Sequence, residues 1–203
     1  MLYNIQEVSM KDSKNTEERK QEFVDAAEKL FKENGIMDTT VNNIVKELDV
    51  AKGLFYYYFK SKDDVIDAIS QKYNDAFNQS MMKNMSSTDW KQQVDQFIDN
   101  CIQSFADMDA KLKGKRDDVD LSALSSRSVH EAKQASSRAL RKLLEEGNRI
   151  KKTAICDADY YAELITGGIA YMVSKGDRDA EKIKEIVWDL INRSGKDENN
   201  EGF

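Results

Sequence analysis

Residues 40–62 read TVNNIVKELDVAKGLFYYYFKSK. The first half of this stretch has apolar residues at the i, i+3, i+4 and i+7 spacing of a short amphipathic helix: Val41, Ile44, Val45 and Leu48. A tight break at residues 49–50 follows, and a second short helix is expected over residues 51–59. Two short helices joined by so short a turn cross steeply, as in the helix-turn-helix unit whose second helix lies in the major groove of DNA. The spacing therefore predicts a DNA-binding unit; the plainer alternative is a helical hairpin that packs and binds nothing.

The composition favours an all-α protein. The chain has 203 residues, no proline and only 9 glycines, so few residues interrupt a helix. Hydrophobic residues make up 40% and charged residues 33%, which is a soluble globular balance. No apolar run approaches the roughly 18 residues of a membrane span, and the N-terminus lacks the pattern of a signal peptide. We therefore expect a cytoplasmic protein that does not contact a membrane.

The charge pattern is uneven along the chain. The formal net charge is -6, which argues against a protein that coats nucleic acid. Residues 40–62, however, carry four lysines against two acidic residues. A local patch of this kind attracts phosphates while the rest of the chain stays acidic, so we expect modest non-specific affinity and strong sensitivity to salt.

Patterning along the chain predicts two helical domains with short terminal extensions. We expect a disordered extension over residues 1–14, a three-helix DNA-binding domain over 15–62, a larger helical domain over 63–194 and a disordered tail over 195–203. The first helix is expected to begin near Asn15 and Thr16, which are good N-caps. A fourth helix is expected to begin near residue 62 and to bridge the domains. Met10 is an alternative start site, which would place residues 1–9 outside the natural protein.

One expected helix differs from the others. Residues 164–174 read LITGGIAYMVS and carry no charge, so the helix predicted over 158–174 is buried on every face. The core of one chain covers one side, and a second copy of the chain is the expected cover for the other. Gly167 and Gly168 would let another helix approach closely. The alternative is a buried helix of a monomer.

The stretch 40–62 resembles the TetR family of bacterial transcription regulators. The residues that match the family pattern are Thr40, Val41, Ile44, Val50, Lys52, Gly53, Tyr56, Tyr58, Phe59, Ser61 and Lys62. Two positions depart from it: Asp49 replaces the turn glycine, and Val45 stands where a small residue is usual. Asp enters the left-handed region at modest cost, so the turn should still form. A looser similarity covers residues 143–194.

The resemblance implies three sites. In the family, the recognition helix reads DNA, the last two helices pair with those of a partner as a four-helix bundle, and the larger domain encloses a small-molecule pocket. The implied DNA-binding residues are Thr40, Lys52, Gly53, Leu54, Tyr56, Tyr57, Tyr58 and Lys62, although adjacency should turn at least one of the three tyrosines inward. The implied dimer residues are Ile165, Gly167, Gly168, Tyr171, Met172, Ile183, Val187 and Leu190. The aromatic-rich stripe that would line the pocket comprises Trp90, Phe97, Cys101, Phe105 and Tyr161; plain core is the alternative for these residues.

We therefore expect a sequence-specific, dimeric DNA-binding regulator, most simply a repressor that a small-molecule effector releases from a pseudo-palindromic operator. The alternative is an accessory protein of the same fold that acts mainly through protein–protein binding. An all-α enzyme has no support, because His130 has no catalytic partner at motif spacing and no metal-ligand or cofactor pattern appears. Cys101 and Cys156 match no metal-ligand spacing and are expected to be free thiols. The effector, the operator and the direction of regulation stay open.

Overall fold

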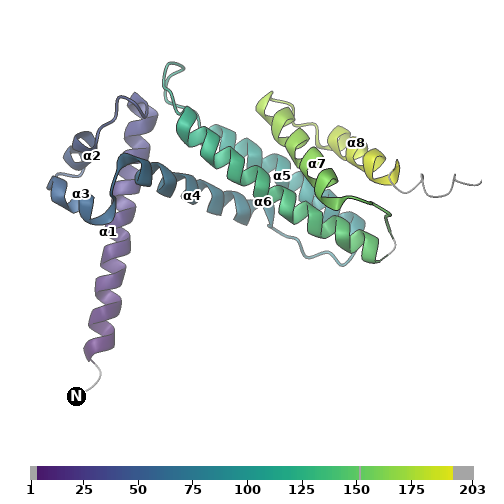
Figure 1. Ribbon diagram of the computed structural model, residues 1–203, viewed down its shortest axis with the longest axis horizontal. Coiled ribbons are helices and arrows are strands. Elements are labelled where there is room, and N and C mark those ends of the chain that lie inside the picture. Colours follow the sequence, from purple (N-terminus) through teal and green to yellow (C-terminus); the bar gives the residue numbers. More distant parts are fainter. Residues whose placement is uncertain (1–3, 151, 194–203) are drawn as a thin grey trace, which may run out of the picture. The chain divides into compact units, whose positions relative to one another are not determined.

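The computed structural model describes residues 4–150 and 152–193, and these residues form helices with no strand among them (Figure 1). The all-α prediction is confirmed. In chain order the helices are α1 (Asn4–Asn34), α2 (Val41–Glu47), α3 (Lys52–Tyr58), α4 (Lys62–Met81), α5 (Trp90–Lys111), α6 (Ser122–Arg149), α7 (Ala158–Ser174) and α8 (Ala180–Arg193). The tail predicted over 195–203 lies outside the described residues.

The chain divides into two compact units. Unit 1 extends to Lys72 and also takes Leu112–Arg127 from the middle of the sequence. Unit 2 comprises Tyr73–Lys111 and the chain from Ser128 onward. Helices α4 and α6 therefore each begin in unit 1 and end in unit 2. The expected division at residue 62 differs from this, because the first half of α4 buries its apolar side in unit 1 and an internal segment joins that unit as well.

Helix α1 is longer than expected. It begins at Asn4, whereas the sequence favoured a disordered extension over 1–14 and a helix start near Asn15. The reason is that neither glycine nor proline occurs before Gly35, so no residue breaks the helix. Gly35 ends the helix with a φ of 89°, as expected of a C-cap glycine.

The core of unit 1 is built around the aromatic rings of α1 and α3. Phe23 and Phe55 are fully buried, and their rings meet edge to face at 5.8 Å. Phe59 is 3% exposed and lies 6.3 Å from Phe23. Ile44 of α2 and Ile69 of α4 are fully buried with them. These contacts hold the short helices α2 and α3, which are too short to be stable alone.

The core of unit 2 lies along α5, which packs against both α7 and α8. The largest fully buried side chains of this unit come from α5, α6 and α8: Phe97, Ile98, Leu140, Leu144 and Ile191. Helix α7 is buried on one side only within the single chain, because Tyr160, Leu164 and Tyr171 are at least half exposed. The exposed side of α7 is the side that the sequence analysis expected a second copy of the chain to cover.

Within the described residues, no helix has both the length and the apolar character needed to cross a bilayer.

Candidate nucleic-acid interface

A reciprocal cap starts the first helix of the motif. The backbone N–H of Asn43 donates to the Thr40 hydroxyl oxygen at 3.2 Å, and the backbone N–H of Thr40 donates to the Asn43 side chain at 2.9 Å. This capping box satisfies donors that the first turn of α2 leaves unpaired. Thr40 thus begins α2, as predicted.

The turn between the two short helices is closed by Asp49 and Val50. Asp49 has a φ of 52°, in the left-handed region that Asp enters more readily than most side chains do. The N–H of Val50 then donates to the carbonyl of Val45 at 3.0 Å. The turn forms without the family glycine, as the sequence analysis expected.

Helix α3 turns its phenylalanines inward and leaves one face open. Phe55 is fully buried, and the residues left outside are Lys52, Gly53, Tyr56 and Tyr57, which we call the recognition face. Tyr56 is 50% and Tyr57 73% exposed. No atom lies within 4 Å of the position that a Cβ of Gly53 would occupy. A DNA backbone or base edge can therefore approach the helix closely at Gly53.

Tyr58 is the inward member of the three consecutive tyrosines. It is half-buried, and its ring lies 5.8 Å from that of Phe23. Leu54 is also half-buried. Both residues therefore lie at the edge of the recognition face rather than on it.

Lys62 has a partner other than the expected phosphate. Its ammonium donates to the carbonyl of Ile36 at 2.6 Å and to that of Thr39 at 2.9 Å. These are backbone carbonyls of the turn between α1 and α2, and a charged donor there ties α4 to that turn. The sequence placed Lys62 among the phosphate contacts, whereas the structure gives it a role in holding the domain together.

The one acidic side chain of α2 is paired with a lysine of α1. Glu47 of α2 accepts a hydrogen bond from the Lys29 ammonium at 2.6 Å, and this bond raises the pKa of Lys29. Lys52 lies 6.0 Å from the centre of the Tyr56 ring, within cation–π range. The Lys52 ammonium thus lies over an aromatic ring that is half exposed to solvent.

A helix-turn-helix with an open, glycine-containing, cationic second helix is the geometry of the family that the sequence resembles. Residues 23–69 match the family profile described as bacterial regulatory proteins, tetR family. These residues form a TetR-family DNA-binding domain. The match includes the last part of α1, all of α2 and α3, and α4 as far as Ile69.

Curated TetR-family relatives match over this region. The HTH-type transcriptional regulator HbdR of Aromatoleum sp. (strain CIB) is 39% identical over 70 residues, which are 34% of this chain and 31% of that protein. An HTH-type transcriptional regulator of Staphylococcus aureus (strain USA300) is 36% identical over 64 residues, covering 32% of this chain and 35% of that protein. The matched region thus spans about a third of the length of these relatives.

Solved structures resemble the chain over most of its length. A TetR-family regulator from Syntrophomonas wolfei gives a TM-score of 0.62 at 16% identity, over 86% of this chain and 93% of that one. The fatty acid degradation regulator FadR from Bacillus halodurans gives a TM-score of 0.57 at 21% identity, over 85% and 93%. At such identities the likeness shows the fold.

Six of the eight residues predicted for dimerisation line an apolar groove on α7 and α8, and Gly167 and Tyr171 do not. The groove measures about 220 Å³, and we call its lining the α7–α8 face: Leu164, Ile165, Gly168, Ile169, Met172, Ile183, Ile186, Val187 and Leu190. Tyr171 is 60% exposed, and a Cβ at Gly167 or Gly168 would meet no atom within 4 Å. The sequence missed Leu164, Ile169 and Ile186, although all three stand at helical spacing from residues that it named.

The five residues predicted for a ligand pocket do not gather in one place. Phe97 lines a cavity of about 440 Å³, and Trp90 lines a separate one. Cys101 and Phe105 are core residues, and Tyr161 is half-buried on α7. No signal in the sequence indicates the first cavity, because its lining comes from segments far apart in the chain.

Both cysteines are free thiols in the structure, as predicted. Burial raises the pKa of Cys101 to about 12, so this thiol is protonated at neutral pH. Cys156 is exposed. Among the described residues, no group of three or more His, Cys, Asp and Glu could hold a metal ion.

Proposed function

We propose that the protein is a transcriptional repressor that binds a pseudo-palindromic operator as a homodimer and is released from it by a small-molecule effector. Its site of action would be the cytoplasm, where the DNA is. The observation that carries this proposal is the recognition face. Lysine, tyrosine and a bare glycine backbone point outward together on the second helix of a TetR-family helix-turn-helix.

Each residue of the recognition face has a contact that suits its chemistry. The Lys52 ammonium can donate to guanine acceptors or to phosphate, and it displaces counterions in doing so. The hydroxyls of Tyr56 and Tyr57 can donate to phosphate oxygens, while their rings contact sugars or thymine methyls. Gly53 keeps the helix backbone close to the groove. Lys62 acts indirectly, because it holds the turn that precedes α2.

The α7–α8 face supports the homodimer. Large apolar side chains rarely form a continuous exposed patch on a monomer, and such a patch marks an interaction surface. Leu164 is 54% and Ile186 50% exposed on neighbouring helices. Open space above Gly168 would admit a helix from a second copy, and a two-fold pair would present two recognition faces to two half-sites.

Operator selection from random duplexes, followed by fluorescence anisotropy on the selected sequence, tests the proposal. Lys52→Ala and Tyr56→Ala should each weaken binding to the selected site by about 1–3 kcal/mol, if these residues read bases. Lys83→Ala, at an exposed lysine of unit 2, is the matched control and should bind like the parent. The proposal fails if no duplex is enriched, or if both recognition-face variants bind like the parent. Such a result would favour the alternative, an accessory protein that acts mainly through protein–protein binding.

A further inference from the structure

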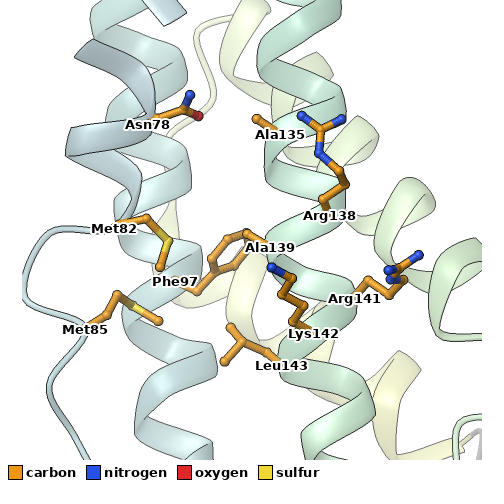
Figure 2. A pocket seen from close by; sticks show the side chains of 10 residues that line it. All are labelled: Asn78, Met82, Met85, Phe97, Ala135, Arg138, Ala139, Arg141, Lys142 and Leu143. Atoms are coloured by element: carbon orange, nitrogen blue, oxygen red, sulfur yellow. The ribbon is translucent and has the colours of Figure 1, made fainter. Parts of the chain in front are cut away.

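The cavity that Phe97 lines has two chemically different sides. The cavity of about 440 Å³ beside Phe97 is lined from the end of α4, from α5 and from α6 (Figure 2). Its volume lies in the range of small-molecule sites, roughly 300–1,000 Å³. All the lining residues belong to unit 2.

One side of the cavity is apolar and adaptable. Met82 and Met85 point toward Phe97 from the segment that follows α4, and Leu143 of α6 lies below them in Figure 2. Phe97 is fully buried behind them, whereas Met82 is 53% exposed. Methionine side chains are flexible and polarisable, so this wall can close around apolar groups of different shape. Because Met82 is exposed at the mouth of the cavity, a bound ligand would bury part of its apolar surface.

The other side of the cavity is cationic. Arg138, Arg141 and Lys142 line it from α6, and Figure 2 shows the Lys142 ammonium extending toward Phe97. Within the described part of the chain, neither Arg138 nor Lys142 has a carboxylate or hydrogen-bond partner, and no aspartate or glutamate lines the cavity. The neighbouring Arg141 differs, because its guanidinium donates to Asp159 at 3.0 Å.

The two unpaired cations destabilise each other in the absence of a ligand. Arg138 and Lys142 are four residues apart on one helix, and like charges at that spacing repel. An anion placed between them would remove the repulsion and accept charge-assisted hydrogen bonds from both. Its apolar remainder would then lie against Met82, Met85 and Phe97.

We propose that this cavity binds an amphipathic organic anion, with its acidic head on Arg138 and Lys142 and its apolar tail on the methionine wall. The inference deepens the proposed function, since it names the chemical class of the effector. The two cations lie on α6, and the methionine wall lies in the segment that follows α4, whose Asn78 also lines the cavity. Helices α4 and α6 both begin in unit 1, so an occupant contacts two elements that continue into the DNA-binding unit.

The test compares head groups on one tail, using the full-length protein without DNA. The probes are dodecanoate, dodecyltrimethylammonium and dodecyl maltoside, each below its critical micelle concentration. Binding is followed by calorimetry and by tryptophan fluorescence, because the Trp90 indole N–H donates to the carbonyl of Leu143 at 2.6 Å and Leu143 lines the cavity. Dodecanoate should bind saturably with one site per chain, and at least about tenfold more tightly than the other two probes.

Substitutions assign that binding to the cavity. Arg138→Gln combined with Lys142→Gln should weaken dodecanoate about tenfold or more and leave the maltoside unchanged. Lys133→Gln, on the same helix but outside the cavity, is the control and should bind like the parent. The proposal is overturned if the cationic or neutral probe binds as tightly as dodecanoate, or if the double variant binds like the parent. Should the double variant fail to fold, the head-group series on the parent decides alone.

This outcome is separable from that of the proposed function. Failure of dodecanoate to bind, with operator binding intact, removes only the effector class. Tight dodecanoate binding by a protein that enriches no duplex would leave the cavity assignment standing and overturn the repressor.

Discussion

The recognition face of α3 and the α7–α8 face both present large side chains to solvent, but they differ in what surrounds those side chains. On α3, Tyr56 and Tyr57 stand beside Lys52, and each carries a polar group that water or phosphate can bond. On α7 and α8, Leu164 and Ile186 stand among other apolar residues, and their side chains cannot form hydrogen bonds with water. The recognition face is stable while exposed to water and suits a partner that binds reversibly. The α7–α8 face suits a permanent protein–protein interface.

The largest effect is expected from a charge on the α7–α8 face. In a two-fold dimer, Gly168→Glu would place one unpaired carboxylate from each protomer in the proposed interface. Burying each charge costs several kcal/mol. Sedimentation or light scattering should then show monomers at micromolar concentration.

Gly168→Ala tests the same position with a methyl group in place of a charge, and its effect on the dimer should be smaller. A Cβ at this position meets nothing within 4 Å in the single chain, so the substitution should leave the monomer intact while it weakens the dimer. A parent protein that is monomeric at micromolar concentration would contradict the assignment of this face.

A matched pair on α3 separates stability from recognition. Phe55→Ala removes a fully buried ring that contacts Phe23 and should lower the free energy of unfolding of unit 1 by about 3–5 kcal/mol. Tyr57→Ala removes a ring that is 73% exposed and should leave stability within about 0.5 kcal/mol of the parent while weakening DNA binding. Chemical denaturation and anisotropy measure the two quantities. Equal stability losses in the two variants would mean that the helix is rotated from the described orientation.

Two lysines that the sequence treated alike should behave differently. Lys62→Ala leaves the carbonyls of Ile36 and Thr39 without their donor and should destabilise unit 1 by about 1–3 kcal/mol. Lys52→Ala should leave the free energy of unfolding unchanged and reduce DNA affinity. Thermal melts of both variants, recorded without DNA, distinguish these outcomes, and a melt of Lys62→Ala that matches the parent would restore its role as a phosphate contact.

The smallest expected effect concerns acid stability at the start of α4. Hydrogen bonds from the backbone N–H of Lys60 and from Ser61 lower the pKa of Asp64 below its ordinary value of 3.8. The stabilisation is therefore fully present above pH 3.8 and is lost as the pH falls through the lower folded value. Asp64→Asn should melt below the parent at neutral pH, and the two curves should converge in strong acid. A difference that persists unchanged at low pH would show that the carboxylate charge is not involved.

The comparison also shows what sequence can predict. The turn at Asp49, the cap at Thr40 and the inward Phe55 were predictable because backbone geometry and helical spacing restrict each position separately. The hydrogen bonds of Lys62 and the cavity beside Arg138 and Lys142 were not, because each depends on groups distant in sequence: two carbonyls of another turn, and lining residues from the end of α4 and from α5. The start of α1 was missed for a different reason, since a good cap residue indicates where a helix can begin and does not prevent it from beginning earlier.

The composition of unit 1 has a practical consequence for protein engineering. The N–H of Ile36 donates to the carbonyl of Asp120 at 3.2 Å, and the N–H of Lys115 donates to the carbonyl of Lys32 at 2.8 Å. Arg127 reaches the carboxylate of Asp67 at 2.6 Å. A chimera made by grafting only the first helices onto another regulator would leave these partners behind. A working exchange of DNA specificity must therefore transplant two separate pieces of the gene, the second of which encodes residues 112–127.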